Sequence, residues 1–306
     1  MNIGARASWT SVRGHRYFSL DPRTAMKYQF TDALAAKLSF TGMTQMVHRI
    51  ASTYLDMPTD YWVPITNKIQ PMRSRQIAGG VYAQPSPRWL LTVEGFYKRT
   101  RHQLQYRDWM GLQPAANRWD KDVMDGRGRS YGVEADARYT APALTLIASY
   151  TLSWSQRQFD ELGKDWFRDK FDNRHKVTVT GRWNISRTTS MYASWLFHSG
   201  NRITLPTQYI NLPDLPGDEP QDDAGYAYGK VNNFALPAYH RLDVGFNFRY
   251  QTRKGHERVW NLSIYNAYCH LNTMYVKMNR DTEGKIQPKC RGYVPTVPSV
   301  SYTMKF

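Results

Sequence analysis

The sequence predicts an all-β fold in which about twelve antiparallel strands form a transmembrane β-barrel. Three observations support this prediction. Apolar and polar residues alternate with a period of two, the alternating runs are long, and the segments between the runs are short and long in turn. A barrel of this kind turns its apolar side chains toward lipid and its polar side chains toward an enclosed aqueous lumen.

The alternation is clearest in the stretch YHRLDVGFNFRY, residues 239–250. Leu242, Val244 and Phe246 share one parity, whereas Arg241 and Asp243 share the other. Because successive side chains of a strand point to opposite faces, this stretch has one apolar and one polar face. Similar runs occur at 3–9, 26–31, 34–41, 75–81, 89–98, 131–139, 144–154, 177–184, 191–197, 260–264 and 300–306.

Strand length and loop length both favour a membrane protein. The runs reach about nine to thirteen residues, enough to cross a bilayer at a tilt, whereas most soluble strands have about five or six. Short turns are predicted at 31–33, 84–87, 140–143, 186–188 and 252–257, long loops at 46–74, 101–129, 156–172, 199–238 and 271–293, and a medium loop at 11–21. Short turns on one rim and long loops on the other are typical of the bacterial outer membrane.

The composition agrees with an amphipathic wall. Aromatic residues make up 14% of the 306 residues, beside a hydrophobic fraction of only 41%. Aromatic residues near the strand ends are expected to form the two interfacial girdles. These residues are Trp9, Trp89, Tyr139, Trp154, Trp183 and Tyr250.

The net charge of +16 would by itself favour an acidic partner such as nucleic acid. However, the Lys and Arg residues are spread singly through the sequence and form no basic run that would follow a phosphate backbone. We therefore expect no nucleic-acid partner.

Nine segments, in the same order as in the family, resemble the C-terminal barrel half of TonB-dependent outer-membrane receptors of the Bacteroidetes type. They are MTQMVHRI (43–50), MPTDYWVPITNKIQPMRSRQ (57–76), SYGVEADARYT (130–140), SYTLSWSQRQF (149–159), FDNRHKVTV (171–179), SGNRITLP (199–206), LPAYHRLDVGFNF (236–248), LSIYNAYCHLN (262–272) and PSVSYTMKF (298–306).

The resemblance implies a receptor barrel of roughly twenty-two strands filled by an N-terminal plug. Such receptors import siderophores, cobalamin-like cofactors or oligosaccharides with energy from the TonB complex, which reads a motif on the plug. The signal peptide, the plug and roughly the first ten strands have no counterpart in this sequence. We therefore expect a single-domain fragment over residues 1–306 that reaches the TonB complex only through the absent plug.

The resemblance also implies partners for the barrel itself. The ending Tyr302, Met304 and Phe306 resembles the terminal signal read by the barrel assembly machinery. These three side chains also share the parity that we expect to face outer-membrane lipid. The other implied partners are the missing plug and strands of the same receptor.

Aromatic residues in the long loops form the candidate ligand surface, since flat rings stack on sugars or on a flat chelate. Arg202, Arg73 and Arg75 are candidate partners for acidic groups of a ligand. The alternative is that these rings pack the loops against one another. The candidates are Tyr61, Trp62, Trp109, Trp119, Trp166, Arg202, Tyr209, Tyr226 and Tyr228.

No catalytic motif, cofactor site or metal site is predicted. His256 and Glu257 begin like a zinc-protease helix, but Trp260 stands where the second histidine ligand would be. The other histidines occur singly near the predicted strand tops. Cys269 and Cys290 flank the last long loop, and this spacing fits either a loop-closing disulfide or two free thiols. We expect a transporter and not an enzyme.

Two alternatives remain open at this point. One is a self-contained twelve-stranded barrel that acts as a pore or as a membrane-embedded lipase, because twelve is an even number that permits closure. The other is a soluble carbohydrate-binding β-sandwich, in which the alternating apolar residues would pack against a second sheet.

Overall fold

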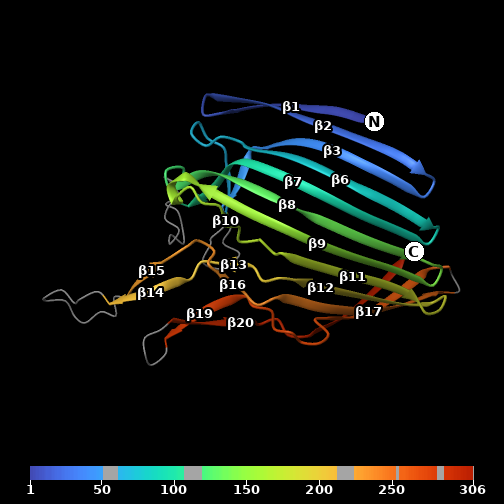
Figure 1. Cartoon of the computed structure of the whole chain (residues 1–306). Helices are drawn as coiled ribbons and strands as arrows, with labels where there is room; N and C mark the ends of the chain where they lie inside the picture. The colour runs from blue at the N-terminus through green and yellow to red at the C-terminus, as the bar shows by residue number, and fades with distance from the viewer. Residues whose placement is uncertain (51–60, 107–118, 212–223, 253–254, 281–285, 306) are drawn as a thin grey trace.

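The computed structural model describes residues 1–50, 61–106, 119–211, 224–252, 255–280 and 286–305. In this part of the chain, twelve strands follow one another along a single antiparallel sheet, in sequence order (Figure 1). They are β1 (Asn2–Val12), β2 (His15–Thr31), β3 (Leu34–Gln45), β6 (Met72–Ser86), β7 (Trp89–Tyr106), β8 (Val123–Thr140), β9 (Leu144–Phe159), β11 (His175–Asn184), β12 (Thr189–His198), β17 (Tyr239–Gln251), β18 (Glu257–Tyr265) and β21 (Val297–Lys305). The predicted all-β antiparallel fold is confirmed.

The remaining elements belong to the long connections, and we call them the loop layer. Figure 1 shows their hairpins at one end of the sheet, opposite the end where both chain termini are marked. The elements are β4 (Val47–Ile50), β5 (Tyr61–Pro64), a 3-10 helix (Asp160–Leu162), β10 (Phe167–Arg168), β13 (Arg202–Ile203), β14 (Pro206–Asn211), β15 (Ala224–Tyr228), β16 (Phe234–Ala235), β19 (Tyr275–Arg280) and β20 (Ile286–Arg291). Among the described residues, no helix is long and apolar enough to cross a membrane.

One face of the main sheet is apolar and uncovered, and we call it the outer face. Ile3 is 74% exposed and Trp9 is 68% exposed, and Tyr28, Val93 and Val300 are likewise exposed on this face. All five belong to the parities that the sequence assigns to lipid. Because no second sheet or helix packs on these side chains in the described structure, the β-sandwich alternative is wrong.

The opposite, inner face carries the polar parity. In β17, the side chains of Arg241 and Asp243 lie on this face, and Arg241 Nη2 forms an ion pair of 2.9 Å with Asp243 Oδ2. The two end strands of the sheet, β1 and β21, each have one hydrogen-bonded neighbour, and the described residues show no pairing between them. The twelve described strands therefore do not close on themselves into a barrel, as the first alternative requires.

The connections agree with the predicted alternation except at one hairpin. The five predicted short turns join β2–β3, β6–β7, β8–β9, β11–β12 and β17–β18. The predicted medium loop at 11–21 is wrong, because β1 and β2 stay paired as far as Val12 and His15. Only Arg13 and Gly14 form the turn, with φ values of 48° and 78°. Two successive positive φ angles are the requirement of a tight hairpin turn, which glycine meets without steric cost.

Several strands also extend further into the predicted loops than the alternation indicated. β7 and β8 each contain 18 residues, and they stay paired up to Tyr106 and Val123. The predicted loop at 101–129 is correspondingly shorter. The loop at 156–172 also contains the upper end of β9 and the short return strand β10, which pair with each other.

Much of the buried apolar core of the described residues lies in the loop layer and not in the sheet. In one cluster, Ile50, Val63 and Ile69 pack against Leu104 and Val123 at the tops of β7 and β8. A second cluster of Ile203, Leu205 and Leu236 packs against the β19–β20 hairpin. These two cores fix the β4–β5 and β13–β16 hairpins above the sheet, since a buried apolar side chain contributes about 1.5–3 kcal/mol.

Candidate functional site

The carboxylate of Asp172 organises the centre of the loop layer. Its side chain is fully buried, and its Oδ1 atom accepts a hydrogen bond of 2.9 Å from the backbone N–H of Ser155 in β9. Its Oδ2 atom is bound by Arg168 Nε, and by Arg174 Nε at 3.2 Å. A buried carboxylate is stable only when donors of this kind surround it, so the loop between β9 and β11 is held in one arrangement.

Arg202 lies at the edge of this network. Its Nη1 atom donates to the carbonyl oxygen of Asn232 at 3.4 Å, and Asn232 Nδ2 donates to the carbonyl oxygen of Arg168 at 2.8 Å. Burial lowers the pKa of the Arg202 guanidinium, and the positive charge of Arg168 lowers the pKa further, whereas Asp172 opposes both effects. Positive charge is therefore concentrated where the β9–β11 and β12–β17 loops meet.

The ion-pair network around Asp172 contains more guanidinium groups than carboxylates. A second ion pair joins Arg157 Nε to Asp169 Oδ2 at 2.9 Å. Four guanidinium groups, those of Arg157, Arg168, Arg174 and Arg202, thus share two carboxylates among the described residues. An anionic ligand complements such a surplus.

The predicted ligand residues do not form one described surface. Trp62 is 63% exposed on β5, whereas Trp119 packs against the apolar cluster below that hairpin. Trp166 lies under the guanidinium of Arg129, whose Cζ atom is 4.3 Å from the ring centroid. Tyr228 is partly buried in β15. Trp109 lies outside the described residues, as do the side chains of Tyr61, Tyr209 and Tyr226.

Arg73 and Arg75 do not lie where a ligand in the lumen would meet them. They belong to β6 and share the parity of Ile77 on the outer face, and both arginines are exposed there. The expectation that they meet a ligand in the loops is therefore corrected. The sequence was misleading here because lipid normally excludes a charged side chain from these positions of a membrane strand, so the two arginines were grouped with the adjacent loop.

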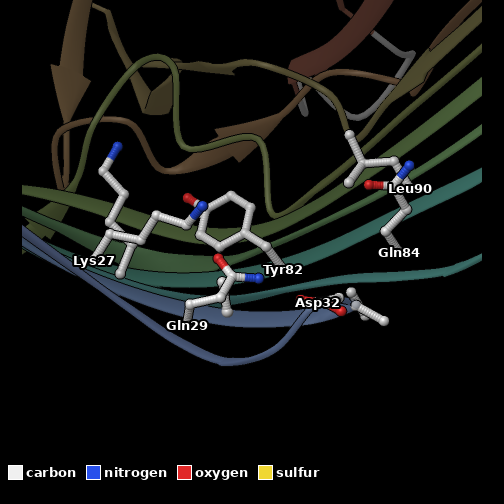
Figure 2. Close-up of a pocket in the computed structure, with 10 residues that line it drawn as sticks. Lys27, Gln29, Asp32, Tyr82, Gln84 and Leu90 are labelled. Atoms are coloured by element: carbon white, nitrogen blue, oxygen red, sulfur yellow. The ribbon is translucent and has the colours of Figure 1, made fainter.

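The inner face has a hollow of about 290 Å³ near the short-turn end of β2, β3 and β6. Figure 2 shows Lys27, Gln29 and Tyr82 projecting into it from the same side of the sheet. The hydroxyl of Tyr82 donates a hydrogen bond of 2.7 Å to Glu94 Oε2. Glu94 lies directly opposite Glu134 on β8. The only sequence signal for this hollow is the polar parity of its strands, and none of the predicted ligand residues lies in it.

The two cysteines are free thiols in the structure, which is one of the two arrangements that the loop spacing allows. Cys290 lies in β20 and is paired with Val276 of β19. Cys269 lies in a turn after β18, where its backbone has a φ of 57°. The β19–β20 hairpin begins only after this turn, so the antiparallel register does not bring the two thiols together.

Two histidines that are far apart in the sequence meet in the structure. The rings of His240 and His270 stack with their centroids 3.6 Å apart, and the Tyr268 hydroxyl lies 2.9 Å from His240 Nδ1. The sequence showed them only as single residues near strand tops. Among the described residues, no three His, Cys, Asp or Glu side chains gather in a way that would hold a metal ion.

The long sheet with an apolar outer face, a polar inner face and a loop layer at one rim defines an outer-membrane β-barrel protein. A family model described as TonB-dependent receptor-like, beta-barrel, matches residues 1–267. The chain belongs to this family of outer-membrane receptors, which confirms the predicted resemblance. No curated protein matches the chain.

Solved receptor structures share the fold. The ferric-catecholate import receptor of E. coli K12 has a TM-score of 0.56 and 13% identity, over 95% of this chain and 35% of that chain. For the ferripyoverdine receptor of Pseudomonas aeruginosa the values are 0.57, 12%, 95% and 34%. For the ferric yersiniabactin uptake receptor of Yersinia pestis they are 0.58, 14%, 95% and 38%. The chain thus spans about a third of the length of these receptors.

Proposed function

We propose that this chain forms part of the wall and loop layer of a receptor that captures a scarce nutrient and imports it with energy from the TonB complex. The observation that carries the proposal is the order of features along the strands. A loop layer fixed by its own apolar cores and by Asp172 stands at one rim, and a polar inner face continues below it. This arrangement suits a rigid capture surface above a passage through the membrane.

We also propose that residues 1–306 act as one barrel domain that is completed by further strands and by a plug. The support is that β1 and β21 each use only one edge for pairing in the described sheet. In a bilayer, a free strand edge leaves N–H and C=O groups without partners, which is costly. In this proposal the TonB complex is contacted through the plug and not through the strands described above.

Among siderophores, cobalamin-like cofactors and oligosaccharides, a negatively charged ferric chelate fits the loop layer best. The support is the surplus of guanidinium groups around Asp172 and Arg202. Arginine binds carboxylate oxygens through two parallel hydrogen bonds. The exposed ring of Trp62 offers a flat surface on the same loop layer.

A binding panel tests the proposal with the full chain purified in detergent. The ligands are a ferric catecholate chelate, ferric citrate, cobalamin and a maltooligosaccharide, and quenching of tryptophan fluorescence reports binding. We expect the anionic ferric chelates to bind. Arg202→Gln should weaken their binding about tenfold, because it removes one charge-assisted contact. Arg182→Gln on the inner face, near the short turns, is the matched control and should have no effect.

Preferential binding of the uncharged oligosaccharide would contradict the ferric-chelate assignment and leave the receptor proposal in place. Failure of all four ligands to bind to folded protein would count against nutrient capture by this chain. An equal loss of affinity in Arg182→Gln would show that total charge, and not the loop layer, accounts for binding.

A further inference from the structure

Six arginines form two rows across the outer face of three neighbouring strands. In the register of β6, β7 and β8, Arg73 lies opposite Arg101, and Arg101 lies opposite Arg127. Two residues lower on each strand, Arg75 lies opposite Arg99, and Arg99 lies opposite Arg129. We call these six residues the arginine rows.

The arginine rows point away from the lumen. Arg99 and Arg101 are exposed, whereas Thr100 between them is 6% exposed on the inner side. Ile77 and Tyr97 continue the same parities downward and are 48% and 45% exposed. The arginines therefore continue the lipid-facing surface of the barrel toward the loop layer.

Positive charge in the arginine rows is only partly balanced by the protein. Arg127 Nη2 pairs with Asp160 Oδ1 at 3.3 Å. Arg129 Nε donates a hydrogen bond of 2.7 Å to Gln156 Oε1, and its guanidinium stacks on the ring of Trp166. Within the described ranges, no carboxylate forms an ion pair with Arg75, Arg99 or Arg101. Like charges directly opposite one another on neighbouring strands are destabilising, so this arrangement calls for an external anion.

Hollows on the outer face accompany the unbalanced charge. A hollow of about 340 Å³ is lined by Arg73, Arg75, Arg99 and Arg101, together with Phe40, Gln76, Ile77 and Tyr97. A neighbouring hollow of about 400 Å³ is lined by Arg99, Arg101 and Arg127, and also by Asp125 and Asp160, whose carboxylates pair with His102 and Arg127. Arg99 and Arg101 line both hollows, and the first hollow, whose lining contains four arginines and no carboxylate, is the more cationic of the two.

The position of the arginine rows along the membrane normal indicates which kind of anion they would meet. The residue pairs directly below them include Tyr97, Tyr131 and Trp154, whose rings lie side by side with centroid distances of 6.4 Å and 5.4 Å. Aromatic rings of this kind mark the boundary between the hydrocarbon and the headgroups. The rim with the long loops is the extracellular one, so the arginine rows lie level with the headgroups of the outer leaflet.

We propose that Arg75, Arg99 and Arg101 bind the phosphorylated headgroup of a lipid in the outer leaflet. The planar guanidinium group binds phosphate through two parallel hydrogen bonds, and three such groups in a hollow that opens toward lipid match a bulky phosphate-bearing headgroup. The acyl chains of this lipid then pack along Ile77 and Val81 on the outer face. This binding site is separate from the loop layer and does not depend on the transported nutrient.

The experiment measures lipid binding to the full chain in dodecyl maltoside by native mass spectrometry. The probes are lipid A with its phosphates, enzymatically dephosphorylated lipid A, and inorganic phosphate at the same phosphate concentration. We expect the intact lipid to bind much more tightly than either comparator. The triple substitution R75Q/R99Q/R101Q should weaken its binding about 100-fold, at about fivefold for each charge. R138Q/R182Q, which removes two exposed charges from the inner face, is the control and should change nothing.

Equal binding of the two lipid forms would overturn the proposal, because the phosphate would then play no part. Equal binding of inorganic phosphate would show an anion site that does not recognise lipid, and it would overturn the lipid assignment. If the triple variant does not fold, R99Q alone should weaken binding about fivefold. For the unsubstituted chain, the affinity should fall as salt rises, and an affinity that does not depend on salt would also reject the proposal.

Discussion

The backbone N–H of Ser155 donates a hydrogen bond of 2.9 Å to Oδ1 of Asp172 and thereby ties the upper end of β9 to the loop that follows it. The same carboxylate also forms ion pairs with the guanidinium groups of Arg168 and Arg174. A single buried side chain thus joins a membrane strand to the loop layer. Its replacement tests how far the arrangement of the loops depends on it.

Asp172→Asn should loosen the loop between β9 and β11 without unfolding the sheet. The neutral amide leaves two guanidinium groups without their partner, which costs about 3 kcal/mol in a buried pair. Limited proteolysis should show faster cleavage within residues 160–174. Asp160→Asn is the matched control, because the side chain of Asp160 is 76% exposed and its pair with Arg127 contributes little. Equal cleavage of the two variants would contradict the role of Asp172.

His48 should make the docking of the β4–β5 hairpin sensitive to pH. The side chain is 2% exposed, its Nε2 atom donates to the carbonyl oxygen of Gln70 at 2.9 Å, and burial lowers its pKa from the ordinary value of 6.5. The unfolded hairpin therefore binds a proton more readily than the folded one. The contribution of His48 to the stability of the docked hairpin is therefore fully present above pH 6.5, and it is lost as the pH falls below 6.5 and through the lowered pKa of the folded state.

Hydrogen exchange of the β5 amides at several pH values measures this effect. Exchange rates, corrected for the intrinsic effect of pH, should rise below pH 6.5. His48→Gln keeps an N–H donor for Gln70 and removes the titration, so its corrected rates should not change. A pH dependence that persists in this variant would assign the effect to another group.

A charge placed on the outer face should be costly, whereas the same charge one residue away should not be. Val93 is 54% exposed in the middle of the apolar band, and Thr92 beside it lies on the inner face. Val93→Arg should destabilise the folded protein in lipid vesicles by about 2–4 kcal/mol. Thr92→Arg should cost less than 1 kcal/mol by the same denaturant titration. The reverse order of the two costs would mean that the faces are assigned wrongly.

The C-terminal strand carries the proposed barrel-assembly signal. Tyr302 is 44% exposed on the outer face, and its ring lies 4.9 Å from that of Trp260, while Phe306 lies outside the described residues. Tyr302→Ala should slow insertion of the chain by purified assembly machinery several-fold. Thr303→Ala, on the other face of the same strand, should insert at the normal rate. Equal rates for the two variants would leave Tyr302 with only a lipid-facing role.

Both cysteines should react with a thiol reagent before any reduction. Cys269 is exposed and should react quickly, whereas Cys290 packs against the second loop-layer core and should react more slowly. Intact mass spectrometry should therefore show two labels without reductant. Labels that appear only after reduction would establish the disulfide that the loop spacing allows.

The sheet could be predicted from the sequence because contact with lipid requires an apolar side chain at every second residue of each membrane strand. The apolar side chains of β17 and the short turn after β2 follow directly from that rule. The turn at Arg13 and Gly14 was missed because the polar residues around Gly14 obscure an alternation that continues on either side. Arg73 and Arg75 were misplaced for a related reason. Above the hydrocarbon band, lipid no longer excludes charge from the outer face.

The loop layer was less predictable because its contacts join residues that are far apart in the chain. Nothing near Asp172 in the sequence indicates that Ser155 will donate to it. The stacking of His240 on His270 likewise depends on how the turn after β18 folds back over β17. Such contacts are set by the packing of hairpins, and no periodic pattern encodes them.

The length of β7 and β8 has a mechanical consequence. Each contains 18 residues, or about 60 Å of strand, which is about 40 Å along the membrane normal at a tilt near 45°. The apolar band needs only about 25 Å of this height. The paired strands β7 and β8 therefore extend well beyond the hydrocarbon region of the membrane as a continuous hydrogen-bonded ladder. Any opening or closing at the cell surface must occur in the hairpins attached to this stiff support, because bending the support would break its ladder.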